Sequence, residues 1–394
     1  MREAIRLLEG EFYAARPLEQ YRWLREHEPV FRDEVGRIWG VTLHEDVLAI
    51  SKNPGLWSSA AGSRPYSMPL PSMIDQDDPQ HKRRRNLVNR GFTPRRVQDH
   101  EPSIRSICHE LVDRVQAQGR CEFVRDIAAL LPMIVIGDLL GVEPADRDKL
   151  LRWSEEMLGS TDASAPPEAH QRAAHATLEY MSYAAEVIRD RRARPLTGDL
   201  MSVLVHAEID GERLADDELI HESLLLLVGG DETTRHVITG GMEALIRHPD
   251  QRAKLVADPR RIPVAVEEML RWVTPIKNMN RTALQDTELR GQKIRQGEPV
   301  LLLYESANRD ARAFARPDVF DVERDPNPHV AFGGQGTHFC LGASLARLEL
   351  RVMFEVLLER LPDLALASAA PLVLRRSNFI VGIESMPVEF TPAS

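Results

Sequence analysis

The chain has 394 residues, of which 43% are hydrophobic and 28% are charged, and its formal net charge is −10 at pH 7. This composition is typical of a globular protein whose core is large enough to enclose a cofactor, and the negative charge disfavours nucleic acid as a partner. The three cysteines, Cys108, Cys121 and Cys340, are too few and too scattered for a disulfide framework or clustered zinc ligands, so we expect a reducing cytoplasm.

The N-terminus has no apolar signal core, and no segment is suited to anchoring the chain in a membrane. The longest apolar stretch, 127–142, is too short to span a bilayer and is interrupted by Pro132 and Asp138. The sequence therefore predicts a protein that is neither secreted nor membrane-anchored.

The first 71 residues predict a small β-containing region followed by a loop. The elements expected before residue 60 are, in order, a helix at 17–28, strands at 30–31 and 37–42, and a helix at 45–51. The loop 60–71 is rich in Gly, Ser and Pro but also contains Tyr66, Met68 and Leu70. Because a plain solvent linker has few such apolar side chains, we interpret the loop as a pocket wall or a lid.

A strongly basic helix is predicted at 78–89. His81 and Arg85 are four residues apart and share one face of it. The other basic residues of this region are Lys82, Arg83, Arg84, Arg90, Arg95 and Arg96. The region is either a solvated basic surface or a site for an anion, such as the carboxylates of a cofactor or an acidic protein.

The middle of the chain is helical, and one of its helices has an unusual centre. Helical patterns are expected at 101–118, 123–140, 147–158 and 167–192, with a loop at 160–167, and again at 216–248. Within the last helix an all-apolar run at 224–228 is followed by Gly-Gly-Asp-Glu-Thr-Thr at 229–234. Glycines weaken a helix and threonine can bond back to its backbone. The pattern indicates either a local distortion at a functional site or a simple helix break.

The segments that follow alternate between regular and irregular patterns. They are a helix at 263–273, an irregular stretch at 274–281, a strand at 298–304, an irregular meander at 315–328 and a strand-like region at 372–390. Glu268 and Arg271 lie three residues apart on the first of these and can pair. Such pairs are common on helix surfaces, so the signal is weak alone.

A glycine-rich loop at 331–342 presents Cys340 immediately before a helix that extends to about residue 361. Its glycines allow φ > 0 and the close approach of a large group, and a helix N-terminus favours a thiolate. A thiolate in such a loop can ligate haem iron. The alternatives are a small buried hydrophobe, a phosphate cradle or a flexible turn. The phosphate alternative lacks both the preceding strand and the Lys-Ser/Thr that such a loop requires.

Taken together, the Cys loop, the upstream GGDETT helix and the ExxR helix between them resemble the cytochromes P450, which are haem-thiolate monooxygenases. The resemblance covers essentially the whole chain. It implies a mainly α fold with small β-sheets, in which haem lies between the GGDETT helix and the Cys-loop helix. The chain 1–394 is expected to form a single domain, and its β-rich parts are expected at about 28–60, 275–305 and 370–392.

The resemblance also implies roles for individual residues. Cys340 would ligate the iron, and Glu232 and Thr233 would relay protons to bound dioxygen. The residues expected to contact haem, besides Cys340, are His81, Arg85, Arg281, Phe332, His338 and Gly342. The expected structural set is Glu268, Arg271 and Arg324. The family usually places phenylalanine seven residues before the cysteine, whereas here Gly333 holds that place and Phe332 is eight before. Which side chain packs beneath haem is therefore left open.

Several segments are more specifically similar to the actinobacterial steroid side-chain hydroxylases. They are 123–142, 229–236, 267–281, 306–310 and 377–392. This similarity implies hydroxylation of the terminal side-chain carbon of cholesterol or cholest-4-en-3-one. The expected substrate contacts are Met68, Leu70, Met73, Val228, Gly229, Ile276, Met279, Phe379 and Ile380. A fatty acid or a terpene would suit such an apolar pocket equally well.

The resemblance further implies haem b, O2 as co-substrate, and electrons that come from NAD(P)H through a ferredoxin and its reductase, because 394 residues leave no room for a fused reductase. Arg83, Arg84 and their neighbours would face the acidic donor. The protein is expected to be a cytoplasmic monomer. A peroxide-driven haem enzyme and a non-catalytic haem sensor are the other classes, and the Glu232–Thr233 pair argues against the former.

Overall fold

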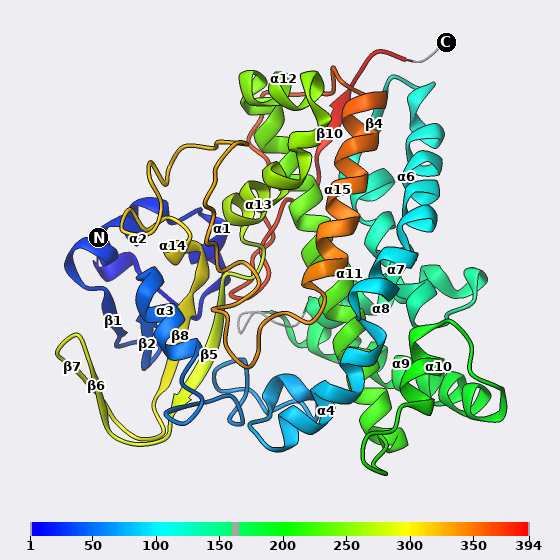
Figure 1. Ribbon diagram of the computed structural model, residues 1–394. Helices are drawn as coiled ribbons and strands as arrows, with labels where there is room; N and C mark the ends of the chain where they lie inside the picture. Colours follow the sequence, from blue (N-terminus) through cyan, green and yellow to red (C-terminus); the bar gives the residue numbers. More distant parts are fainter. Residues whose placement is uncertain (1, 160–164, 393–394) are drawn as a thin grey trace.

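The computed structural model describes residues 2–159 and 165–392 (Figure 1). Most of the loop predicted at 160–167 lies outside these residues. Helices dominate the described chain, and a smaller β-region lies to one side of them (Figure 1). No helix among the described residues combines the length and the apolar character that crossing a bilayer requires.

The helical body is built around α11 (Asp216–Arg247), which packs against α7, α9, α13 and α15. The other helices of this body are α4 (Gln80–Val88), α5 (Pro94–Asp99), α6 (Glu101–Gln116), α7 (Leu130–Leu139), α8 (Arg147–Leu158), α9 (Pro167–Ala193), α10 (Leu200–His206), α12 (Pro249–Ala257), α13 (Ile262–Val273) and α15 (Ala343–Arg360). The largest apolar core cluster lies among them. The mainly helical fold that the sequence predicted is confirmed.

Short helical segments complete the chain. They are α1 (Gly10–Ala14), α2 (Leu18–His27), α3 (His44–Ser51), α14 (Tyr304–Ala307), the 3-10 turns η1 (Arg2–Ala4), η2 (Met73–Asp75), η3 (Asn89–Gly91), η5 (Pro144–Asp146) and η6 (Pro259–Arg261), and the π-turn η4 (Val124–Ala128). The single helix expected at 123–140 is thus divided into η4 and α7. The sequence analysis did not assign α10 or α12.

The main sheet has the strand order β1-β2-β8-β5-β3. Its strands are β1 (Val30–Asp33), β2 (Ile38–Val41), β3 (Trp57–Ser58), β5 (Asn278–Ala283) and β8 (Pro299–Leu303). Among the strand pairs of this sheet that the structure describes, only β2–β8 is parallel. The strands predicted at 30–31 and 37–42 are confirmed as the antiparallel pair β1 and β2, with Val30 opposite Val41. The prediction of an irregular segment at 274–281 is wrong in its second half, because β8 and β3, distant in sequence, provide the hydrogen bonds that make 278–283 a strand.

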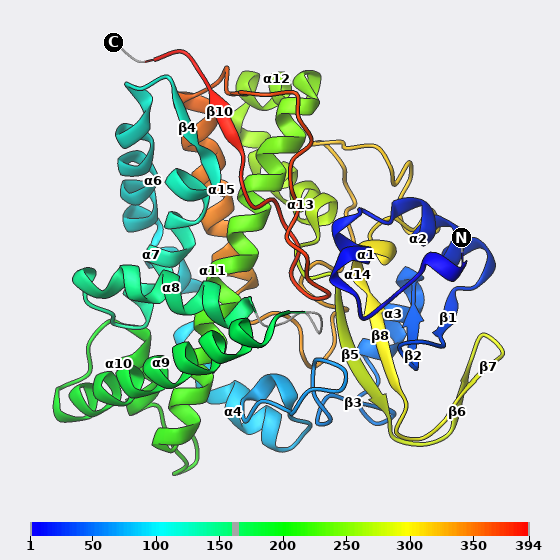
Figure 2. The ribbon, with the colours of Figure 1, turned by 180° about the vertical axis from the view of Figure 1, so that it is seen from behind.

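Two smaller sheets lie outside the main one. They are formed by β4 (Arg120–Glu122), β10 (Pro387–Glu389) and β9 (Ala365–Leu366), and by β6 (Thr287–Leu289) and β7 (Gln292–Ile294). The strand-like region predicted at 372–390 contains only β10 and two isolated bridges, Ile276–Ile380 and Leu374–Ile383. The rest of this segment runs irregularly between the helical body and the main sheet (Figure 2).

Helix α11 is uninterrupted through all four of its glycines, Gly229, Gly230, Gly240 and Gly241, so the alternative of a helix break at 229–234 is wrong. Tertiary packing accounts for this continuity, since a Cβ on Gly230 would press against Ile136 of α7 and one on Gly241 against Met269 and Phe354. The glycines therefore allow neighbouring helices to approach α11 closely.

Candidate active site

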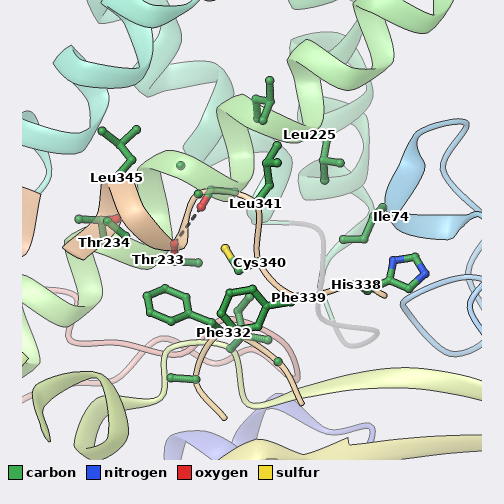
Figure 3. Close-up of a pocket in the computed structure, with 18 of the residues that line it drawn as sticks. Ile74, Leu225, Thr233, Thr234, Phe332, His338, Phe339, Cys340, Leu341 and Leu345 are labelled. Atoms are coloured by element: carbon green, nitrogen blue, oxygen red, sulfur yellow. Dashed lines mark hydrogen bonds between the residues drawn. The ribbon is translucent and has the colours of Figure 1, made fainter. Parts of the chain in front are cut away.

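A largely apolar cavity lies between α11, the loop 331–342 and the start of α15 (Figure 3). The α11 residues that line it are Leu225, Leu226, Gly229, Gly230, Thr233, Thr234 and Val237. They recur at helical spacing, so one face of α11 forms this wall. Figure 3 shows the sulfur of Cys340 directed into the cavity, near Thr233 and the rings of Phe332 and Phe339.

The loop that carries Cys340 is folded by its own backbone and by α3. Cys340 N donates to Phe332 O at 2.9 Å, and Gly333, with φ +92°, has its N–H bonded to Val330 O at 2.9 Å. A Cβ on Gly334 or Gly336 would collide with Ser51 of α3. These two glycines are therefore required for contact with α3, whereas the sequence analysis had attributed the glycines to the approach of a large group.

The Cys340 thiol is open to the cavity, and the cavity itself lies within the protein. Burial raises the pKa of this thiol, although the backbone N–H groups of Gly342 and Ala343 and the charges of Arg85 and Arg347 oppose the shift. The helix N-terminus alone therefore does not yield the expected thiolate. A metal cation bound to the sulfur would, because a coordinating thiol is deprotonated.

The basic and imidazole side chains predicted to contact a cofactor meet on one side of the cavity. His81, Arg85, Arg281 and His338 all line it, and the rings of His81 and His338 lie 4.2 Å apart between centroids. Burial lowers the pKa of both histidines, that of His338 to about 3, so both are neutral.

One atom of this group lacks a partner within the described part of the protein. His81 is 1% exposed, and its Nδ1 lies 3.3 Å from Asp78 Oδ1. Its Nε2 is buried and has no partner among the described residues. A buried polar atom without a partner is costly. Two guanidinium groups and two imidazoles on one side of an apolar cavity, beside the loop that carries a thiol, fit the carboxylates of a haem group.

Two aromatic side chains, those of Phe332 and Phe339, lie on the cavity wall near Cys340. Phe332 lines the cavity, and the Arg347 guanidinium lies 4.6 Å from the centroid of its ring. Phe339 lies on the same wall, with its ring centroid 6.2 Å from that of Phe332. Phe332 therefore presents its ring to the cavity despite the one-residue offset.

The two residues predicted to relay protons face different directions. Thr233 lines the cavity, and its Oγ1 donates to Gly229 O at 2.8 Å (Figure 3). Glu232 is fully buried and is not among the lining residues. Arg235 and Arg375 donate to its carboxylate at 3.0 and 2.9 Å, and His236 Nε2 lies 3.2 Å from it.

The environment of Glu232 determines its charge. Burial alone would raise the pKa of Glu232, but His236, Arg375 and Arg235 together hold that pKa well below its usual range. Glu232 is therefore an ionised group that points away from the cavity, and its role in relaying protons stays a prediction. It reaches the cavity only if it exchanges these partners for others.

The structural set predicted from the ExxR pattern forms behind the Cys loop. Arg271 donates to both oxygens of Glu268 at 2.7 and 2.8 Å, and Arg324 Nε donates to the same carboxylate at 3.0 Å. Glu268 and Arg271 are 0% exposed. The sequence analysis missed Asn327, whose amide donates to Glu268 at 3.2 Å, and Asp321, whose backbone N–H does so at 2.9 Å.

The predicted substrate contacts are only partly found on the cavity wall. Met73, Gly229, Ile276 and Met279 line it. Met68 and Leu70 do not, because their side chains project from the loop into solvent and are 89% and 50% exposed. These two expectations are corrected.

Three further expected contacts also lie off the wall. Val228 is turned away from the lining face of α11, Phe379 lies beneath the guanidinium of Arg64 at 4.4 Å, and Ile380 pairs with Ile276 in a β-bridge. The sequence analysis missed Ile74, Leu225 and Leu226. The last two could have been found from the helical spacing that places them on the face of Gly229 and Thr233.

The expectation that Arg83 and Arg84 face an external acidic protein is also corrected. Arg83 bonds Glu212 and Glu218, and Arg84 bonds Glu218 and Glu222. These arginines are held by carboxylates of this chain.

Comparison with known proteins agrees with the geometry of the site. The family model of cytochrome P450 matches residues 71–362. A steroid C26-monooxygenase from Mycolicibacterium smegmatis is 52% identical over 394 residues, covering 100% of this chain and 98% of that protein. A methyl-branched lipid omega-hydroxylase from Mycobacterium tuberculosis is 39% identical, covering 90% and 84%. The crystal structure of CYP109E1 from Bacillus megaterium in complex with testosterone is 32% identical with a TM-score of 0.86, covering 95% and 99%.

Proposed function

This chain belongs to the cytochrome P450 family of haem-dependent monooxygenases, and we propose that it hydroxylates the terminal side-chain carbon of a steroid such as cholesterol or cholest-4-en-3-one. The observation that carries this proposal is the 52% identity, over essentially both full lengths, to a steroid C26-monooxygenase. The cavity supports it, since the wall that α11 presents opposite Cys340 is apolar except for Thr233 and Thr234.

The residues present fit haem b. Cys340 would ligate the iron, Phe332 and Gly342 would lie against the ring, and His81, Arg85, Arg281 and His338 would hold its carboxylates. When bound, haem supplies the iron at which dioxygen is activated. The side chains of this protein do the rest, since they orient the substrate, exclude water and deliver protons.

We propose that protons reach the cavity through Thr233 and Glu232. The Thr233 hydroxyl is already on the wall, and it must release Gly229 O to donate elsewhere. Glu232 would alternate between its present partners and water on the cavity side. Its charge favours uptake of a proton from solvent once Arg375 or Arg235 is released.

Thr233→Ala should therefore uncouple electron consumption from product. We expect the variant to consume reductant at a rate close to that of the wild type. Most of the electrons should then reduce dioxygen to hydrogen peroxide, and little alcohol should form. The measurement is the ratio of alcohol formed to reductant consumed. Thr239→Ala is a matched control, because Thr239 Oγ1 donates to Arg235 O at 2.9 Å in the same way but does not line the cavity. Unchanged coupling in Thr233→Ala would reject the relay role.

Electrons are proposed to come from a ferredoxin and its reductase, and ultimately from NAD(P)H. Lys82, Arg90 and Arg95 are exposed and form no ion pair within the described chain. They lie on α4, η3 and α5, and α5 packs against α15, the helix that begins shortly after Cys340. We assign the docking of an acidic donor to these residues instead of Arg83 and Arg84. Turnover with ferredoxin and reductant but not with peroxide alone would separate this proposal from a peroxide-driven enzyme.

The substrate class is tested by titrating the ferric protein with cholest-4-en-3-one, palmitic acid and a monoterpene while the spin state is followed. We expect the largest shift to high spin at the lowest concentration with the steroid. A fatty acid is the second candidate, since a relative at 39% identity is a lipid omega-hydroxylase. The absence of any steroid response would end the steroid proposal.

A further inference from the structure

A buried carboxylate on α11, Glu222, belongs to none of the roles described above. It is 0% exposed and precedes the cavity residues Leu225 and Leu226 by three and four positions. Its Oε1 accepts from Met73 N at 2.8 Å and from Arg84 Nη1 at 3.2 Å. An ionisable side chain is rarely fully buried unless it is paired. The two groups that donate to Glu222 therefore indicate its role.

Both bonds act on the same short segment of chain. Met73 begins η2, and its backbone N–H is held directly by Glu222. Arg84 also donates to Pro71 O at 2.7 Å, so the residue that pairs with Glu222 holds the segment two residues earlier. Pro71–Met73 is therefore tied to α11 and α4 through its backbone.

This segment carries part of the cavity wall. Met73 and Ile74 line the cavity, as does Leu225 of α11. Figure 3 shows the side chains of Ile74 and Leu225. Just before it, the loop is fixed by Asp75, which accepts from Ser63 N at 2.6 Å and from Leu70 N at 2.7 Å. Both partners of Asp75 belong to this same loop, so these two bonds do not connect the loop to α11. Glu222 and Arg84 are what relate Met73 and Ile74 to the helix that carries Thr233.

We propose that Glu222 is a positioning residue for regioselectivity. By fixing the Met73–Ile74 wall relative to α11, it selects which carbon of an apolar chain end reaches the reacting centre. This inference rests on the proposed function and deepens it. The terminal carbon of the substrate and the carbon next to it lie about one bond length apart. A displacement of the reacting atom by about 1 Å can change the reaction rate about 100-fold. A small shift of this wall therefore suffices to change the product.

The proposal is tested with Glu222→Leu and Glu222→Gln holoenzymes. Glutamine keeps an oxygen that can accept from Met73 N, whereas leucine leaves that N–H without a partner. Glu243→Leu is the matched control, because Glu243 is also a buried carboxylate on α11, 5% exposed, but is paired with Arg247 and Arg16 away from the cavity.

The first measurement is hydrogen exchange of the peptide that spans 70–76, which requires no substrate. In Glu222→Leu we expect the Met73 amide to exchange about tenfold faster, the factor that corresponds to losing one buried hydrogen bond. Glu222→Gln and Glu243→Leu should leave this rate within about twofold of the wild type.

The second measurement is the ratio of terminal to inner-carbon alcohol from cholest-4-en-3-one. We expect the terminal alcohol to dominate in the wild type, in Glu222→Gln and in Glu243→Leu, and to lose its dominance in Glu222→Leu. If the wild type does not oxidise the steroid, the proposed function fails separately, and palmitic acid provides the same ratio. An unchanged ratio in Glu222→Leu would overturn the inference.

A second variant keeps the test decisive if Glu222→Leu does not fold. Arg84→Leu removes the bond to Pro71 O while leaving Met73 N bonded to Glu222. It is tolerable because burial raises the pKa of Glu222 to about 7, so the carboxyl can take up a proton when its cation is lost. We expect the product ratio to move in the same direction by a smaller factor, and no movement would contradict the proposal.

Discussion

Replacing Cys340 with serine is expected to abolish both the thiolate spectrum and the monooxygenase activity. Among the described residues, Cys340 contributes the only thiol to the cavity wall, and a serine hydroxyl holds its proton far more tightly than a thiol does. The variant would therefore lose the anionic sulfur that donates electron density to the iron. Activity should fall by more than about 100-fold, the upper range for losing a hydrogen-bonding partner of a metal ligand.

The measurement is the difference spectrum of the reduced protein with carbon monoxide, taken together with the amount of haem retained. Cys121→Ser is the control, since Cys121 lies in β4 and does not line the cavity. It should retain the thiolate band. A Cys340→Ser protein that binds haem and keeps that band would refute the assignment of the ligand.

Local patterns in the sequence predicted the elements whose structure is determined locally. Helix α8 begins and ends at the predicted residues, and α6, α9 and α13 do so within two. The Glu268–Arg271 pair was predictable because both residues lie on one helix, three positions apart. Strand β5 was not, because 278–283 is extended only through its pairing with β8 and β3.

The direction in which a side chain points was harder to predict than the helix or strand to which its residue belongs. Glu232 and Thr233 are adjacent, yet only Thr233 reaches the cavity, since successive helix residues are rotated by about 100°. Arg375, which holds Glu232 on the other side, is 143 positions away in sequence. Met68 was expected in the pocket because it is apolar, but the hydrogen bonds that fix its loop direct it into solvent.

The glycines of the Cys loop illustrate the same difference. Their presence correctly predicted a close approach, but the sequence could not identify the approaching group. Gly334 and Gly336 pack against Ser51 of α3, about 280 residues earlier in the chain. A large side chain at either position would therefore displace the loop from α3 and move Cys340 with it.

The second large effect is expected from Glu268→Gln. Glu268 and Arg271 are both fully buried, and Glu268 also accepts from Arg324, Asn327 and the backbone of Asp321. The amide cannot accept from all of these donors and leaves Arg271 without its counter-charge. Removing one partner of a buried ion pair typically costs about 3–5 kcal/mol.

We therefore expect Glu268→Gln to lower the free energy of unfolding by about 3–5 kcal/mol and to reduce the fraction of protein isolated with haem. Both follow because Arg271 and Arg324 bind the backbone carbonyls of 308, 315, 317 and 319, which precede the Cys loop. Urea unfolding followed by circular dichroism and by haem absorbance measures the two effects. The control is Glu323→Gln, whose carboxylate is 41% exposed and pairs with the partly exposed Lys254 and Arg261, so its loss should cost about 1 kcal/mol or less. An equal decrease in the free energy of unfolding for the two variants would mean that the Glu268 cluster does not support the Cys loop. The buried charge network would then stabilise the fold no more than an exposed ion pair does.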